Sequence, residues 1–208
     1  NFRCEGDLNS YLKEYDITGI EGVDTRALTR ILRSQGTMNG MITCAEHFHM
    51  EDCLARVRAY RVEGTVERVT RSAPQVYPAV TEQRLRVALL DYGVKQNMIR
   101  CLQDRGCQVT VYPAHTAART ILEGGFDGVM LSNGPGDPAD NDGLIREVRA
   151  LYDSDLPLFA VCLGHQLLAL ATGASTRKMT FGHRGGNHPV RDVASGRAFI
   201  TSQNHGYV

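Results

Sequence analysis

Residues 86–171 alternate short apolar runs with amphipathic segments, and this alternation constrains the fold more than any other feature. The apolar runs have the length of buried strands; they lie at residues 87–93, 108–113 and 127–132. The other segments have the apolar spacing of helices; they lie at residues 96–105, 117–122 and 144–151. This order predicts an α/β fold with a doubly wound, mostly parallel sheet, right-handed crossovers and helices on both faces. Ligands of such sheets bind beyond the carboxyl ends of the strands.

Residues 156–171 predict a strand, a sharp turn and a helix, with Cys162 at the turn. Ala160 and Gly164 are small, and they leave room for the kind of turn that the G-x-S-x-G motif makes. A cysteine there projects from the carboxyl end of a strand and lies near the positive end of a helix, which favours the thiolate. This position suggests a nucleophile, although a cysteine in an apolar run can also be a small core residue.

Residues 133–138 form a loop dense in glycine and proline at the carboxyl end of the preceding strand. Glycines let backbone N–H groups point into a cavity, and a thiolate that attacks a carbonyl needs such donors for the resulting oxyanion. An N–H of this loop and the N–H of Leu163 would form a pair of donors. A plain tight turn is the alternative interpretation. A phosphate loop is disfavoured, because the prolines remove donors and the lysine and hydroxyl of that motif are missing.

The C-terminal part predicts a loop at residues 181–190, rich in glycine and polar residues, and a strand at residues 198–202 that carries residues 203–207 to an end of the sheet. His183 and His188 could be metal ligands, but no third ligand follows at a suitable spacing, so a binding loop is favoured. His47 and His49 also lack partners and are expected in a loop. We expect no metal site.

The N-terminal part predicts a small mixed α/β domain over residues 1–70. Asp24 has the position of an N-cap for a helix over residues 25–33, which Gly36 ends. Residues 41–44 suggest a short strand, and residues 50–60 suggest a second helix. Residues 71–85 lack periodicity and contain prolines, so they are expected to be a linker to the domain at residues 86–208.

Composition argues against several classes of function. The 208 residues are 42% hydrophobic and 22% charged, with a formal net charge of +0. Without a long basic run, we expect neither nucleic acid nor a membrane surface as a partner. The six cysteines form no C-x-x-C pair and do not suggest a disulfide framework, so we expect free thiols and a cytoplasmic location.

Taken together, these segments resemble a known family. Residues 159–166 resemble the nucleophile signature of class I glutamine amidotransferases, with Ala160 in place of the usual glycine, and residues 133–136 resemble their oxyanion loop. Further matching segments resemble the small-subunit family of carbamoyl phosphate synthetases; they lie at residues 22–30, 39–40, 131–138, 164–171, 181–190 and 203–207.

The resemblance implies hydrolysis of L-glutamine through a thioester on Cys162, with Gly134 and Leu163 as oxyanion donors. It also implies a set of residues that hold the amino-acid portion of glutamine: Gly136, Gln166, Asn204, Gly206 and Tyr207. The ammonia would pass to a large synthetase subunit, in an assembly that serves arginine and pyrimidine biosynthesis. That partner would use ATP, Mg and bicarbonate, and this chain would carry no cofactor.

The family's histidine base and its acid are expected beyond Val208, and a further glutamine-contacting serine is expected before Asn1. We therefore expect an internal fragment that is nearly inactive alone; His205 matches a substrate-loop position and is not expected to be the base. Two other functions stay open. One is a catalytically incompetent binding or regulatory module, and the other is a different class I amidotransferase, which the N-terminal domain and the loop at residues 182–190 disfavour.

Overall fold

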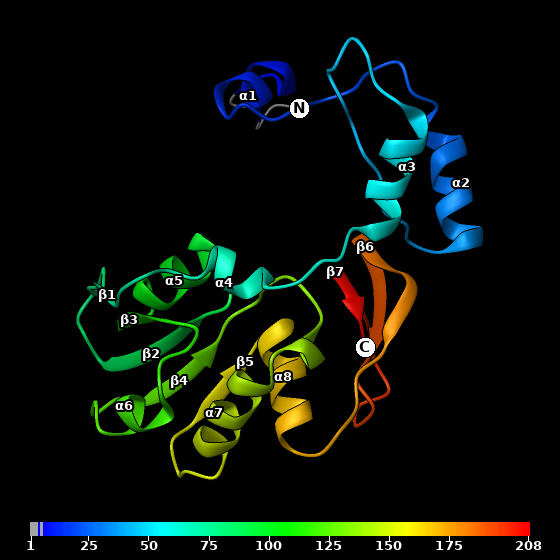
Figure 1. Cartoon of the computed structure of the whole chain (residues 1–208). Coiled ribbons are helices and arrows are strands. Elements are labelled where there is room, and N and C mark those ends of the chain that lie inside the picture. The colour runs from blue at the N-terminus through cyan, green and yellow to red at the C-terminus, as the bar shows by residue number, and fades with distance from the viewer. Residues whose placement is uncertain (1–3, 5) are drawn as a thin grey trace. The chain divides into compact units, whose positions relative to one another are not determined.

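The computed structural model describes residue 4 and residues 6–208, and the chain divides into two compact units, Asn1–Arg61 and Val62–Val208 (Figure 1). Each unit is described by itself. The second unit contains the predicted alternation of strands and helices, and it contains every predicted site residue.

A five-stranded sheet of order β1-β3-β2-β4-β5 forms the centre of the second unit. Its strands are β1 (Gln75–Tyr77), β2 (Leu85–Asp91), β3 (Cys107–Pro113), β4 (Gly128–Leu131) and β5 (Leu158–Ala160). Strands β2 to β5 are parallel and β1 is antiparallel to β3. The predicted α/β class and mostly parallel sheet are confirmed.

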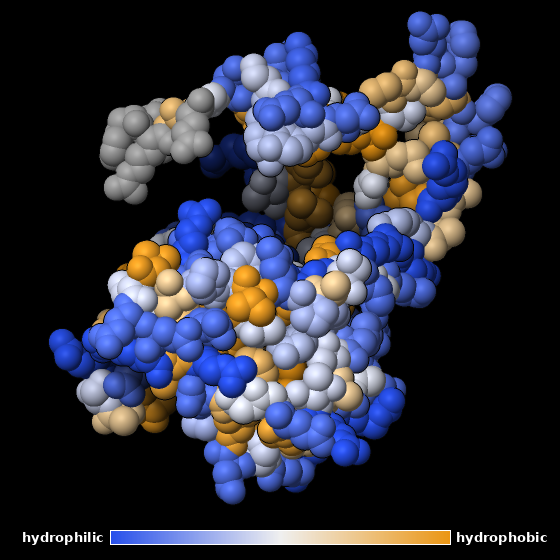
Figure 2. Space-filling view, turned by 90° about the vertical axis from the view of Figure 1, so that its left-hand side faces the viewer, coloured by the Kyte–Doolittle hydropathy of each residue, from blue (hydrophilic) through white to orange (hydrophobic). Residues whose placement is uncertain are grey.

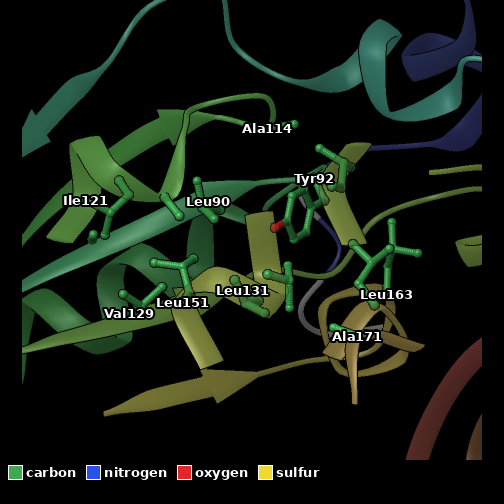
Figure 3. Packing of buried hydrophobic residues seen from close by; sticks show 14 of the residues in the cluster. Leu90, Tyr92, Ala114, Ile121, Val129, Leu131, Leu151, Leu163 and Ala171 are labelled. Carbon is green, nitrogen blue, oxygen red and sulfur yellow. The ribbon is translucent and has the colours of Figure 1, made fainter. Parts of the chain in front are cut away.

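Helices cover both faces of this sheet, as predicted. Leu89 of β2 packs in one cluster with Ile99 of α5 (Gln96–Gln103). Its neighbour Leu90 points to the other face, because successive side chains alternate along a strand. There it joins a cluster to which α6 (Ala118–Leu122), α7 (Asp142–Tyr152) and α8 (Leu163–Ala171) contribute. Figure 3 shows this cluster, in which Tyr92, Leu131 and Leu163 pack together.

The chain reverses its direction across the sheet between β2 and β4. From β2 it passes through α5 to β3, whereas from β4 it passes through α7 to β5, on the opposite side. In doubly wound sheets, ligands bind where adjacent strands lead away in opposite directions. The carboxyl ends of β2 and β4 therefore mark the expected position of a site.

Two long strands form a separate antiparallel sheet, β6 (Lys178–Arg191) with β7 (Ala198–Tyr207). The expected loop at residues 181–190 is thus wrong, and residues 203–207 continue β7 without joining the main sheet. Glycine and polar residues obscured the strand, because they remove both β-propensity and alternation. Shifts of register between Lys178 and His183 and between Gly185 and His188 accommodate this irregular sequence.

The structural boundary differs from the sequence-based one. Helix α4 (Thr65–Val69) belongs to the second unit because its Val66 is fully buried in the main cluster. Strand β1 lies within the expected linker, where Gln75 pairs with Val111 of β3. A three-residue edge strand has too few residues to show periodicity, so only its partner reveals it.

The first unit contains α1 (Leu8–Glu14), α2 (Thr25–Gln35) and α3 (Met50–Ala59). The predicted cap of α2 is confirmed, since Asp24 accepts a hydrogen bond of 2.9 Å from the Ala27 N–H. Residues 41–44 form no strand, so the strand expected there is wrong. None of these helices buries a side chain, and hydrophobic residues lie at the surface of the unit (Figure 2). Among the described helices, none has the length and apolar character needed to cross a bilayer.

Candidate active site

Cys162 lies in a sharp turn between β5 and α8, with φ 52° and ψ −110°. A non-glycine residue at positive φ is strained, and such strain persists only where the surroundings enforce it. Among the described residues, Asp16 is the other non-glycine residue with positive φ. The predicted strand, turn and helix around Cys162 are confirmed, and the half-buried cysteine forms the N-cap of α8.

Gly164 holds this turn tightly against β4. A Cβ at Gly164 would lie 2.6 Å from both the Cβ and the carbonyl oxygen of Leu131. The Gly164 N–H donates to the carbonyls of Ser132 (3.0 Å) and Val161 (3.1 Å). Because these neighbours are mainly backbone atoms, they cannot give way to a side chain at position 164, and glycine allows α8 to begin this close to β4.

Ser132 anchors the loop that follows β4, and its side chain is fully buried. The Ser132 hydroxyl accepts a hydrogen bond from the Tyr92 N–H and donates one to the Asn133 carbonyl, both at 2.9 Å. The Asn133 amide donates to the Gly93 carbonyl (3.0 Å). These bonds fasten the loop after β4 to the loop after β2.

Gly134 lies where three segments meet. A Cβ there would collide with the Tyr92 carbonyl and would lie 2.7 Å from Cδ2 of Leu163. Glycine therefore permits a close approach that no other residue could make. The Leu163 N–H is the first of α8, and the first four amides of a helix have no partner within it. Loop 133–138 and the start of α8 thus come together beside Cys162.

A cavity of about 950 Å³ lies at this end of the sheet. All the predicted site residues except Leu163 line it, and they are Gly134, Gly136, Cys162, Gln166, Asn204, Gly206 and Tyr207. Leu163 is 1% exposed, so its side chain belongs to the core. Its backbone N–H is the only part that can take the predicted role.

Residues of the main-sheet side and of the β6–β7 pair both line the cavity, and Gln166 links the two sides. The Gln166 amide donates a hydrogen bond of 2.6 Å to the Tyr207 carbonyl, and the Gln166 N–H donates to the Cys162 carbonyl (3.0 Å). The side chain of Gln166 therefore ties the cysteine's own helix to the end of β7. Burial and the neighbouring Asp137 carboxylate raise the pKa of Tyr207, which keeps its phenol neutral at physiological pH.

Three histidines gather on β6 and β7, where the sequence suggested two. Nδ1 of His183 lies 3.1 Å from Nε2 of His205, and the His183 and His188 rings are 4.7 Å apart. His205 is already engaged, because its Nδ1 lies 2.8 Å from the Tyr207 carbonyl and its Nε2 lies 3.0 Å from Oε1 of Gln203. Across residue 4 and residues 6–208, no group of three or more His, Cys, Asp or Glu has an arrangement that could hold a metal ion.

The sequence did not single out several residues that shape the site. Buried Asp91 accepts hydrogen bonds from the N–H groups of Gly93 and Val94 and pairs with Arg71 at 3.0 Å. A polar residue at the end of an apolar strand was the available signal for Asp91. Ser132 had the same signal. The cationic side chains of Lys95, Lys178 and Arg184 also line the cavity, and no local pattern indicated this.

The model of the glutamine amidotransferase class-I family matches residues 88–208, which is more than half of the chain. The chain belongs to this family. The match runs from within β2 to the end of β7, and so it contains Cys162, the loop after β4 and the cavity-lining part of β7. A second model, for the CPSase domain of the carbamoyl-phosphate synthase small chain, matches residues 1–42.

The amidotransferase chain also resembles curated proteins over its whole length. It is 44% identical to the carbamoyl phosphate synthase small chain of Photorhabdus laumondii, with 100% of this chain and 58% of the relative covered. It is 46% identical to that of Clostridium perfringens (100% and 58%) and 47% identical to that of Listeria monocytogenes (100% and 56%). The predicted resemblance is confirmed, and the chain spans less than two thirds of these relatives.

A solved structure supports the fold. The crystal structure of a glutamine amidotransferase from Thermotoga maritima matches with a TM-score of 0.50 and 18% identity, over 61% of this chain and 63% of that one. At this identity the likeness concerns only the arrangement of strands and helices.

Proposed function

We propose that this amidotransferase chain carries the glutamine-hydrolysing site of a carbamoyl phosphate synthase small chain. One observation carries the proposal: strained Cys162, the Gly134 loop and the first amide of α8 converge at the switch point of the sheet, beside one cavity. A nucleophile, oxyanion donors and space for a substrate are the parts that acyl transfer requires.

The reaction would proceed in two steps. The Cys162 sulfur attacks the side-chain amide carbon of L-glutamine, and the carbonyl oxygen becomes an oxyanion that accepts hydrogen bonds from the Gly134 and Leu163 N–H groups. The carbon–nitrogen bond then breaks, the nitrogen takes up the proton lost by the thiol and leaves as ammonia, and a glutamyl thioester remains. Water attacks the thioester through a second oxyanion, which releases glutamate and returns the proton to sulfur.

The amino-acid portion of glutamine would lie against cavity-lining residues of α8, β7 and the loop after β4. Gln166 supports this wall through its bond to the Tyr207 carbonyl, and Asn204 and Gly206 line it. Gly136 lines the cavity on the side of the loop after β4. A zwitterionic substrate requires such amide and backbone partners.

We do not assign the role of general base to His205. His205 lines the cavity, but its two ring nitrogens already face the Tyr207 carbonyl and the Gln203 and His183 side chains. The chain spans 58% of the Photorhabdus laumondii relative. The 208 residues alone would then bind glutamine but hydrolyse it very slowly, and near-normal turnover by them would restore His205 as a candidate base.

The proposed partner is a large synthetase subunit that receives the ammonia and uses ATP, Mg and bicarbonate, while this chain uses no cofactor. The names of the relatives support this assignment. All six cysteines are free thiols, which agrees with the proposed cytoplasmic location. Nucleic acid and membrane are not among the proposed partners.

The test is covalent labelling with the chloroketone analogue of L-glutamine, with and without L-glutamine as a protectant. We expect modification of Cys162, protection by L-glutamine but not by D-glutamine, and no modification of Cys162→Ala. Modification of Cys101 or Cys107 in preference to Cys162 would overturn the assignment. Absence of stereospecific protection would favour the alternative, a binding or regulatory module without catalysis.

A further inference from the structure

Hydrogen bonds hold the Arg184 guanidinium in a fixed position in the wall of the cavity. Its Nη1 donates a hydrogen bond of 2.8 Å to the His183 carbonyl and a second one to the His205 carbonyl. The second bond joins β6 to β7, and the two bonds together fix the plane of the guanidinium. An arginine at the surface normally keeps much rotamer freedom, so this double attachment distinguishes Arg184.

Two glycines make room for this side chain. A Cβ on Gly182, which has φ +71°, would lie 2.6 Å from Nη1 of Arg184, and a Cβ on Gly206 would lie 3.5 Å from Nη2. The guanidinium thus lies between two residues without side chains, next to the backbone that the proposed function assigns to glutamine binding. Since Nη1 uses its hydrogens on the two carbonyls, the N–H groups of Nη2 and Nε are the ones left for a ligand.

The charge of the cavity wall is mainly positive. Arg184 and Lys178 on β6 and Lys95 before α5 line it, whereas Asp137 is the acidic side chain among its lining residues. None of these four side chains takes part in an ion pair between described residues. A substrate with a carboxylate would therefore gain a favourable electrostatic interaction in this cavity.

We propose that Arg184 binds the α-carboxylate of L-glutamine and thereby selects a free amino acid as the substrate. This inference rests on the proposed function. A guanidinium presents a planar pair of donors that matches the two oxygens of a carboxylate, and its fixed plane lowers the entropy lost on binding. The carboxylate would lie beside Gly206, on the β6–β7 side of the cavity, and the amide end would extend towards Cys162.

The experiment compares two chloroketone probes on the 208-residue chain, the glutamine analogue and the same molecule without its α-carboxylate. Arg184→Gln should raise the half-saturating concentration of the first probe about tenfold, which corresponds to about 1.4 kcal/mol, and should leave its maximal rate nearly unchanged. The effect is moderate because the side chain is exposed to water. The probe without a carboxylate should react equally with both proteins.

Arg191→Gln is the matched control, because Arg191 lies on the same strand and does not line the cavity. It should behave as wild type with both probes, and Arg184→Lys should lie between wild type and Arg184→Gln. If Arg184→Gln slows both probes equally, the arginine only braces β6 against β7, and the inference is wrong. If neither probe modifies Cys162 of the wild type in preference to the other cysteines, the proposed function itself fails.

Discussion

Replacement of Gly164 by alanine tests the close packing that presents Cys162. The added Cβ would lie 2.6 Å from the Cβ and carbonyl oxygen of Leu131, whereas ordinary contacts begin near 3.4 Å. The start of α8 must then move away from β4 by roughly 0.8 Å, the difference between these distances. Overpacking of this kind typically destabilises a protein by about 1–3 kcal/mol.

Gly143→Ala provides a control with the same chemical change. Gly143 lies in α7, and a Cβ there would meet nothing within 4 Å. It should leave the stability unchanged or raise it by less than the roughly 0.5–1 kcal/mol that alanine gains over glycine in the middle of a helix, because Gly143 is the second residue of α7. Gly164 is likewise the second residue of α8, so the two variants should differ in the free energy of unfolding by the overpacking cost of about 1–3 kcal/mol.

Urea denaturation followed by circular dichroism would measure this difference, and chloroketone labelling of Cys162 would report on the turn. We expect Gly164→Ala to lower both stability and the labelling rate, and Gly143→Ala to lower neither. Equal stability of the two variants would refute the reasoning, because α8 would then not be held against β4 as described.

Three further predictions concern the surroundings of the site. Burial and the Glu147 carboxylate raise the pKa of Tyr92 above 10.0, so above about pH 10 the phenol ionises first in the unfolded chain and the stability of the fold falls. Tyr92→Phe should therefore lose less thermal stability than wild type between about pH 8 and pH 11. An identical loss in both proteins would contradict this assignment. Asp91→Ala should destabilise the fold by about 3 kcal/mol, and Asp91→Asn by less, as measured in urea, because Arg71 and two N–H groups lose their acceptor. Gln166→Leu should raise the concentration of L-glutamine that half-protects Cys162, since the bond to the Tyr207 carbonyl is lost; unchanged protection would exclude Gln166 from binding.

Local patterns predicted most of the main sheet and the turn at Cys162. Strands β2, β3 and β4 are short apolar runs between helices of clear periodicity, and such signals need no knowledge of distant partners. The small residues around Cys162 indicated a sharp turn, and the positive φ bears this out. The alternating order of strands and helices along the chain then implied that the loops after β2, β4 and β5 share one end of the sheet.

Features that depend on distant partners escaped prediction. Strand β6 carries Gly182, Gly185 and Gly186, so its conformation depends on pairing with β7 rather than on its own sequence. Val66 assigns α4 to the second unit only through burial against other elements. The orientation of Arg184 likewise depends on carbonyls of two different strands, His183 and His205.

The rate at which each cysteine reacts with the chloroketone analogue of L-glutamine tests the central claim most directly, namely that the fold makes Cys162 the nucleophile. Peptide mapping would follow all six thiols in native protein and in urea. In the native protein, Cys162 should react much faster than Cys101, although Cys101 is exposed and Cys162 is half-buried, and unfolding should abolish this preference. If exposed Cys101 reacts as fast as Cys162 in the native protein, the claim is wrong.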